Sequence, residues 1–224
     1  MNIAVAIQTC DRYEYTRQTV ESFIKQNALR NYRLYYGDDA STDNRIHDLM
    51  RQYRIPCIYR NRTRQGNART RDKLLHAVAK QSESHDYILP LENDIETVRK
   101  IPIKLIDKIF ENKQIGIFRL FGKYKAPAWG CSSRCAITGK IVKWAPIDIL
   151  GEELACSTIH WTYMPTILPV KLALQLIKGA KREGDSMKAM KKLPFMPRTI
   201  RPRGGLENNF IVHIGNDRTK DYRR

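Results

Sequence analysis

Short apolar runs alternate with helix-like stretches four times in about the first ninety residues, and this rhythm constrains the fold more than any other feature. The apolar runs predict strands at residues 3–9, 33–36, 55–59 and 87–91. Apolar side chains at helical spacing predict helices after Asp11 and Asp43, which are expected to cap them, and at residues 66–79. Alternating strands and helices are typical of a parallel sheet with helices on both faces, so we predict an α/β fold.

The rhythm changes after Asp94, where the predicted elements become irregular. Helices are predicted at residues 103–110, 169–178 and 186–192, and strands at residues 115–121, 136–144 (or a hairpin there) and 209–214. Residues 122–130 are interpreted as a loop because they contain two glycines and a proline. No flexible linker interrupts the chain, so we expect a single domain, residues 1–224, with a regular half, residues 1–121, and a less regular half, residues 122–224.

The composition indicates a globular chain. Its 224 residues suit one domain, and 42% hydrophobic residues are enough for a packed core. No apolar stretch reaches the roughly 20 residues of a membrane span, and residues 1–7 lack the flanks of a signal peptide. The five cysteines, an odd number, favour reduced thiols over a disulfide scaffold. We therefore expect a cytoplasmic protein.

The chain is strongly basic. Forty Lys and Arg residues face 23 Asp and Glu residues, which gives a net charge of +17. Such an excess indicates a polyanionic partner, which is nucleic acid, an anionic membrane surface or a phosphorylated ligand. Basic residues are densest from Lys178 to Arg203, where nine of them stand against Glu183 and Asp185. The alternative is a solvated basic face that binds nothing specific.

Two acidic clusters directly follow two of the predicted strands. The first lies within residues 37–43 and includes Asp38, Asp39 and Asp43, and the second is Glu92-Asn93-Asp94. In an open α/β sheet, ligands bind beyond the carboxyl ends of the strands. Carboxylates offer the hard oxygen ligands that Mg²⁺ and Mn²⁺ prefer. The clusters therefore predict a pocket that holds a metal ion and a phosphorylated ligand.

Arg71 is placed by helical spacing on the inward stripe of its predicted helix, together with Leu75 and Val78. A charge on that stripe needs a partner, because an unpaired buried charge is costly. The partner is expected to be a ligand phosphate or a carboxylate of the acidic clusters, with a structural pair to Asp39 or Asp94 as the alternative.

Four motifs within residues 3–96 carry a resemblance. Gln8-Thr9-Cys10-Asp11-Arg12 is similar to the Pro-Thr-Tyr-Asn-Arg turn of family 2 glycosyltransferases with the GT-A fold, and residues 37–43 are similar to their Val-Asp-Asp-Gly-Ser-Thr-Asp motif. Asn61, Gly66 and Arg71-Asp72 resemble their Asn-x-Gly-x-x-x-x-Arg-Asn segment, and residues 87–94 resemble the strand that ends in their D-x-D motif. Val212-His213-Ile214-Gly215 resembles the last-strand His-x-Gly of many GT-A enzymes.

The resemblance implies a GT-A-like, mostly parallel, Rossmann-like sheet whose first half binds a nucleotide-sugar and whose second half binds the acceptor. It implies a metal-dependent glycosyltransferase, with a UDP-sugar favoured as donor and with inversion at the transferred sugar. Thr9 and Asp39 are then expected to hold the base and ribose. The other implied donor residues are Asp11, Arg12, Arg71, Glu92 and Asn93, and the implied ligands of Mn²⁺ or Mg²⁺ are Asp94, His213 and Glu92. Glu92 stands where the family usually has Asp.

The base that deprotonates the acceptor hydroxyl stays open among four carboxylates. Glu183 and Asp185 precede the predicted helix at residues 186–192, where Asp185 is alternatively only the N-cap. Glu152 and Glu153 are the rivals.

Two further constellations concern the acceptor half. His160 and Trp161 are expected to form an acceptor platform, with ordinary core packing as the alternative. Cys131, Cys135, Cys156 and His160 also have spacings compatible with a zinc site. The basic segment from Lys178 to Arg203 is expected either to contact a membrane that carries a lipid-linked acceptor or to receive an acidic or phosphorylated glycan or glycoprotein.

Two other functions compete with a glycosyltransferase. A nucleotidyltransferase also uses an α/β sheet and acidic clusters, but residues 8–13 contain no glycine for an activating loop. A non-enzymatic nucleic-acid-binding protein would explain the basic charge, but the chain has no recognised RNA- or DNA-binding signature. Nucleic acid is therefore not the expected partner.

Overall fold

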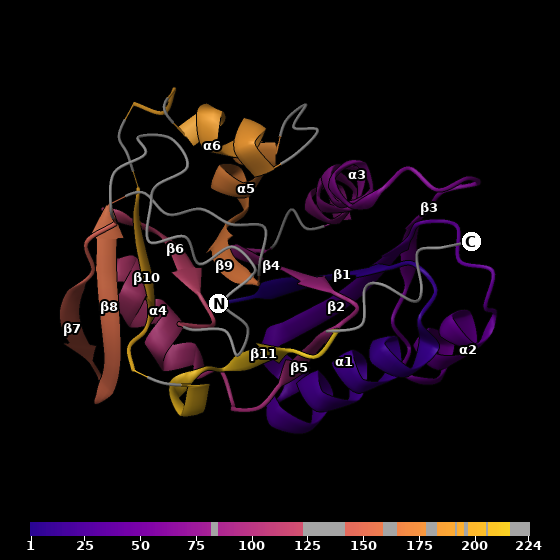
Figure 1. The fold of residues 1–224 in the computed structure, drawn as a ribbon, viewed down its shortest axis with the longest axis horizontal. Helices are drawn as coiled ribbons and strands as arrows, with labels where there is room; N and C mark the ends of the chain where they lie inside the picture. The colour runs from indigo at the N-terminus through magenta and orange to yellow at the C-terminus, as the bar shows by residue number, and fades with distance from the viewer. Residues whose placement is uncertain are drawn as a thin grey trace.

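The computed structural model describes residues 1–81, 85–122, 142–158, 165–177, 183–190, 192–194, 197–204 and 206–215. In these residues a large central sheet is covered by helices on both faces (Figure 1). A separate two-stranded sheet lies beside it. None of the helices in the described segments combines the length and the apolarity that are needed to cross a bilayer.

The central sheet has nine strands among the described residues, in the order β3-β2-β1-β4-β9-β6-β10-β8-β7. Four of them form its parallel N-terminal part: β1 (Ile3–Thr9), β2 (Tyr32–Asp38), β3 (Cys57–Arg60) and β4 (Tyr87–Glu92). The others are β6 (Ile115–Arg119), β7 (Ala145–Ile149), β8 (Glu152–Thr158), β9 (Thr166–Pro169) and β10 (Arg198–Pro202). Only β8 and β9 run against the rest, so the predicted mostly parallel sheet is confirmed.

Six α-helices in the described segments cover the sheet. The first face carries α1 (Tyr13–Gln26), α2 (Arg45–Gln52) and α4 (Ile103–Glu111), and the second carries α3 (Asn67–Gln81), α5 (Val170–Ile177) and α6 (Glu183–Met190). β1 shows why both faces are needed. Ile3, Val5 and Ile7 pack into the first hydrophobic cluster, whereas Ala4 and Ala6 pack into the second.

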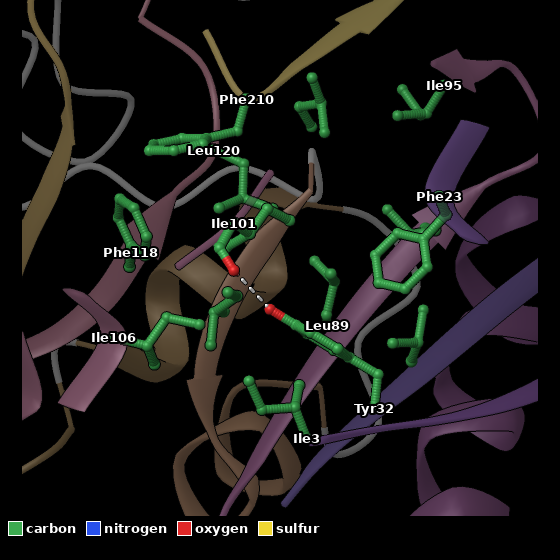
Figure 2. Packing of buried hydrophobic residues seen from close by; sticks show 14 of the residues in the cluster. Ile3, Phe23, Tyr32, Leu89, Ile95, Ile101, Ile106, Phe118, Leu120 and Phe210 are labelled. Atoms are coloured by element: carbon green, nitrogen blue, oxygen red, sulfur yellow. Dashed lines mark hydrogen bonds between the residues drawn. The ribbon is translucent and has the colours of Figure 1, made fainter. Parts of the chain in front are cut away.

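The first cluster also anchors the end of the described chain (Figure 2). Phe210 packs edge-on against Phe118, with ring centroids 5.7 Å apart. On the other side of the cluster, Tyr32 donates a hydrogen bond of 2.9 Å to the carbonyl of Ile101, and burial raises the pKa of its phenol. Each fully buried aromatic side chain contributes about 2–3 kcal/mol of hydrophobic stabilisation. The segment after Phe210 is therefore held firmly on the core.

That segment forms the two-stranded sheet. β11 (Ile211–His213) pairs antiparallel with β5 (Ile95–Thr97), and His213 lies opposite Ile95. β5 begins only three residues after the end of β4. The small sheet therefore brings the C-terminal His-x-Gly segment to the acidic cluster that follows β4.

The predicted strands and helices of residues 1–96 are confirmed within a few residues, but both predicted caps need correction. Asp11 does not cap α1, since Arg12 precedes the helix without a side-chain capping bond. The α2 cap residue is Asn44, although the Asp43 carboxylate accepts the amide hydrogen of Arg45 at 3.0 Å.

After Asp94, the predicted helices and the last strand are confirmed, but several strands were missed. The sequence did not predict β5, β8, β9 or β10, and it placed a strand at residues 136–144, of which only residues 142–144 are described and none is a strand. The observed strand β7 begins at Ala145 and forms a hairpin with β8. α6 begins at Glu183, so Asp185 lies in its first turn and is not its N-cap.

Candidate active site

The two acidic clusters lie side by side at the carboxyl edge of the sheet. β1 lies between β2 and β4, with Thr9 opposite Asp38 and Gln8 opposite Glu92. Two strand spacings, or about 10 Å, therefore separate the clusters across the sheet. The clusters thus lie beyond neighbouring strand ends, which is where ligands bind in open α/β sheets.

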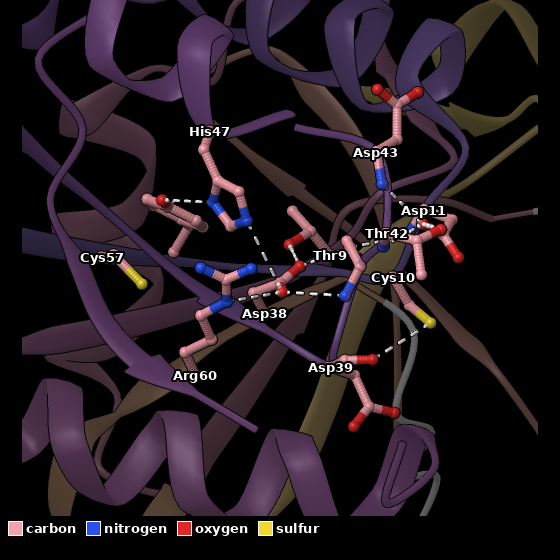
Figure 3. A network of polar contacts seen from close by, with 12 residues as sticks. Thr9, Cys10, Asp11, Asp38, Asp39, Thr42, Asp43, His47, Cys57 and Arg60 are labelled. Carbon is pink, nitrogen blue, oxygen red and sulfur yellow. Dashed lines mark hydrogen bonds and ion pairs between the residues drawn. The ribbon is translucent and has the colours of Figure 1, made fainter. Parts of the chain in front are cut away.

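Asp38 organises the first cluster (Figure 3). Its side chain is fully buried, accepts hydrogen bonds from the Thr9 hydroxyl at 2.8 Å and the Ser41 amide at 2.9 Å, and lies 3.7 Å from Nε of Arg60. A buried carboxylate with several donors is a stable anchor for a turn. Asp38 therefore shapes the loop that carries Asp39.

Thr9 has a supporting place in this network. Its hydroxyl donates to Asp38, its carbonyl accepts the Asp39 amide at 2.8 Å, and its side chain is inaccessible to solvent. Thr9 therefore supports the loop that carries Asp39, and its expected contact with a base or ribose stays a prediction.

Asp39 ties the first cluster to the start of α3. Its carboxylate accepts hydrogen bonds from the Asn61 side chain at 2.7 Å and from the amides of Gln65 and Gly66 at 2.8 and 2.9 Å. A carboxylate has about four acceptor positions, so one remains after these three bonds. Gly66 has φ of +84°, which favours glycine at this turn.

The turn before α1 is strained and braced from both clusters. Asp11 and Arg12 have φ of 50° and 62°, which costs an L-residue about 1–2 kcal/mol each. The Asp11 carboxylate accepts the Thr42 amide at 2.7 Å, and the Asn93 side chain donates to the Asp11 carbonyl at 3.1 Å. Asp11 and Asn93 thus hold the turn, which points the Arg12 side chain toward Asp94.

Asp94 is the centre of the second cluster and is almost fully buried. Its Oδ2 lies 2.9 Å from the Arg12 guanidinium and 3.3 Å from Nε2 of His213. Burial alone would raise the pKa of Asp94, but the hydrogen bond and charge of His213, together with Arg12, outweigh it and lower the pKa. Asp94 is therefore a carboxylate at neutral pH.

The His-x-Gly segment fits around Asp94. The Ile214 amide donates to the Asp94 carbonyl at 2.9 Å. A Cβ atom at Gly215 would lie 2.3 Å from Oδ2 of Asp94, so no side chain is tolerated there without a shift. Glycine at this position lets the backbone close over the carboxylate.

Arg71 finds its partner in Glu92. The side chain of Arg71 is buried, as the helical spacing predicts, and it bonds to Oε1 of Glu92 and to the side-chain oxygen of Asn67. Asn67 also donates to the same Glu92 oxygen at 2.8 Å. The partner is thus a carboxylate of the acidic clusters, Glu92.

Glu92, Asp94 and His213 converge as the resemblance implies. One ligand atom from each lies within 4.8 Å of the other two. Oδ1 of Asp94 is buried and accepts no hydrogen bond within the described part of the chain. A buried acceptor without a partner is costly, and a cation would satisfy it. Two carboxylates and an imidazole suit Mn²⁺, and also Mg²⁺ through the oxygens.

The four candidate bases lie in different surroundings. Both carboxylate oxygens of Glu152 bond to Arg99, at 2.9 and 3.2 Å, whereas Glu153 is exposed at the start of β8. Asp185 is half-buried in the first turn of α6. Glu183 begins the same helix, and its side chain is outside the described part of the structure.

The other acceptor-side candidates mostly lie outside the described residues. This applies to His160, Trp161, Cys131 and Cys135. Cys156 is a free cysteine on β8, and burial raises the pKa of its thiol. The zinc hypothesis therefore stays a prediction from spacing.

Some site residues were missed at the sequence level. Asn67 stands four residues before Arg71, a spacing that brings two side chains together on a helix and that could have indicated its role. The pairing of Arg12 with Asp94 left no such signal, because it depends on the unusual backbone of the turn.

A mostly parallel α/β sheet with two acidic clusters and a carboxylate–histidine cluster at its carboxyl edge is the arrangement that the resemblance to GT-A glycosyltransferases implies. The chain belongs to glycosyl transferase family 2, whose family model matches residues 4–128. No curated protein sequence is similar enough to match.

Solved structures support the fold. Staphylococcus aureus TarS 1–349 is similar with a TM-score of 0.63 and 16% identity over 95% of this chain and 60% of that one. The same protein in complex with UDP-GlcNAc gives a TM-score of 0.58 and 18% identity over 92% of this chain and 60% of that one. The mannosyltransferase PcManGT from Pyrobaculum calidifontis, in complex with GDP-Man and Mn²⁺, is similar with a TM-score of 0.56 and 12% identity over 92% of this chain and 58% of that one. This chain therefore spans about three fifths of the length of these structures.

Proposed function

We propose that this glycosyltransferase transfers a sugar from a nucleotide-diphospho-sugar to an acceptor hydroxyl with a divalent cation at Asp94, His213 and Glu92. The observation that carries the proposal is the carboxylate of Asp94, which lies together with Glu92 and His213 and whose buried Oδ1 accepts no hydrogen bond from the described residues. When bound, the cation would neutralise charge on the leaving diphosphate. The complexes of TarS with UDP-GlcNAc and of PcManGT with GDP-Man and Mn²⁺ support the proposed donor class and the use of a divalent cation.

Several residues would bind the donor without taking part in the transfer reaction. The remaining acceptor position of Asp39 would receive an N–H of the base, and the Gly66 turn would lie beside it. Arg71 would place its positive charge near the phosphates. We favour a UDP-sugar, as the neighbours with UDP and UDP-GlcNAc suggest, with a GDP-sugar as the alternative.

The acceptor hydroxyl would be deprotonated by a carboxylate and attack the anomeric carbon from the side opposite the diphosphate, which inverts that carbon. Glu152 already pairs with Arg99, so we propose one of the other three candidates, Glu183, Asp185 or Glu153. The three cysteines that the structure describes as free, Cys10, Cys57 and Cys156, suit the cytoplasmic location that we propose.

The proposal is tested by thermal unfolding with UDP and GDP, each with and without Mn²⁺, in the intact chain and in Asp94→Asn. A ligand at 100 times its dissociation constant stabilises by about 2.7 kcal/mol, so the intact chain should unfold at a clearly higher temperature with Mn²⁺ and one of the nucleotides. The variant should lose the Mn²⁺-dependent part of this shift.

Asp48→Asn, on the exposed face of α2, is the matched control and should keep the shift. A Mn²⁺-dependent shift that survives in Asp94→Asn would remove Asp94 from the metal site. Indifference of the intact chain to both nucleotides would contradict the proposed function.

A further inference from the structure

A small pocket opens at the carboxyl ends of β6 and β10, in the acceptor half of the chain. It has a volume of about 220 Å³, and its walls are Gly122, Trp144, Pro146, Ala155, Arg201, Pro202, Arg203 and Gly204. Pockets for drug-sized ligands span about 300–1,000 Å³, so this one suits a single sugar ring with one substituent.

The pocket is a neighbour of the candidate metal centre. The amide of Gly122 donates to the side chain of Asn209 at 2.7 Å, and His213 follows Asn209 by four residues. Four extended residues span at most about 14 Å, which bounds the separation of Asn209 and His213. β6 and β10 also run parallel to β4, so their ends face the same edge of the sheet as Asp94. A short glycan with one sugar in the pocket could therefore reach a donor bound at Asp94.

Aromatic and cationic side chains are the lining groups that could contact a ligand. The guanidinium of Arg201 stacks on the Trp144 ring, 4.0 Å from its centroid, and also donates to the Gly122 carbonyl. These contacts fix the planar guanidinium in place. Arg203 is exposed at the rim, and its amide is bonded to the Glu153 carbonyl at 2.9 Å.

Charge complementarity indicates the ligand. None of the lining residues is acidic, and two are arginines. The nearby carboxylates are outside this lining: Glu153 and Asp148 face each other on β8 and β7, and Oε1 of Glu207 would lie 4.0 Å from a Cβ atom at Gly204. The two guanidinium groups are the charged side chains of the lining itself, and guanidinium matches phosphate or carboxylate through paired hydrogen bonds.

We propose that this pocket is an acceptor subsite that selects an anionic sugar. The ring of the sugar packs against Trp144, and its phosphate or carboxylate pairs with Arg201 and Arg203. This inference rests on the proposed glycosyl transfer, since it names the acceptor class of the same reaction.

Binding without catalysis tests it. Glucose, glucuronate and glucose 6-phosphate are titrated into the full chain by ligand-observed NMR at fixed ionic strength. The two anionic sugars should bind about tenfold more tightly than glucose, because each gains a charge-assisted contact. The comparison of glucuronate with glucose 6-phosphate shows which anion is preferred.

Variants locate the effect. Arg203→Gln should weaken the two anionic sugars about fivefold and leave glucose unchanged, whereas Trp144→Leu should weaken all three. Arg30→Gln removes an exposed arginine at the opposite edge of the sheet and should change nothing. Arg203 is exposed, so its replacement does not threaten folding.

Equal affinity for glucose and glucose 6-phosphate would overturn the proposal, as would anionic binding that Arg203→Gln leaves intact. Each variant is also tested for its thermal shift with Mn²⁺ and UDP, which should persist. If the intact chain shows no such shift, the proposed function fails, while the sugar titrations still decide whether the pocket selects anions.

Discussion

At the residue scale, the site depends on a few backbone positions that few residue types tolerate. Asp11, Arg12 and Ala40 all have positive φ, and Gly215 is needed because Asp94 leaves no room for a side chain. The sequence pointed to Asp94 and His213 through their motifs. It did not reveal which side chains pair, because Arg12 reaches Asp94 only through a turn conformation that no residue pattern announces.

Ala40 occupies a position where the family motif has glycine, and its φ is 57°. A left-handed conformation costs alanine about 1–2 kcal/mol, and glycine loses about 0.5–1 kcal/mol more chain entropy on folding. Ala40→Gly should therefore stabilise the protein by about 0.5–1 kcal/mol, measured as a higher urea midpoint. Ala77→Gly, inside α3, should instead destabilise it by about 1 kcal/mol. A lower midpoint for Ala40→Gly would show that neighbouring contacts of its methyl group outweigh the backbone cost.

At the element scale, predictability follows the strength of the periodic signal. β1 is buried along its whole length, and α1 and α2 have clear apolar stripes, so residues 1–96 were predicted well. β7 is mostly exposed, and β5 and β9 have only three and four residues. Short or exposed strands exist because a neighbour pairs with them, and such a neighbour cannot be read from local sequence.

The contact of α3 with β4 leads to a prediction about metal affinity. The guanidinium of Arg71 forms an ion pair with Glu92, one of the proposed metal ligands, and so places a positive charge beside the metal site. Without nucleotide, Arg71→Met should therefore bind Mn²⁺ about fivefold more tightly, measured by electron paramagnetic resonance. In the intact chain UDP should tighten Mn²⁺ binding, because its phosphates offset Arg71, and the variant should lose most of this gain.

Arg69→Met replaces an exposed arginine of the same helix and should leave both affinities unchanged. Weaker Mn²⁺ binding in Arg71→Met would reverse the interpretation, since Arg71 would then orient Glu92 for the cation.

At the scale of the whole molecule, the halves are joined beside the site by Arg99, just after β5. Its guanidinium bonds to Glu152 on β8 and to the Asn208 carbonyl, and it lies 4.1 Å from the centroid of the Phe210 ring. One side chain thus connects the N-terminal half, the β7–β8 hairpin and the segment that leads to His213. The position of this proposed metal ligand depends on contacts more than a hundred residues apart, which explains why the site needs both halves.

This connection predicts that Arg99→Gln weakens metal binding although Arg99 touches no proposed ligand. The pair with Glu152 is partly exposed, so its loss together with the ring contact should cost only about 1–2 kcal/mol of stability in urea unfolding. Mn²⁺ affinity should fall several-fold, because β11 then holds His213 less firmly. Arg51→Gln removes an exposed ion pair with Asp48 and should alter stability by less than about 0.5 kcal/mol and Mn²⁺ affinity not at all. Unchanged Mn²⁺ affinity in Arg99→Gln would mean that the packing of Phe210 alone fixes β11 on Asp94.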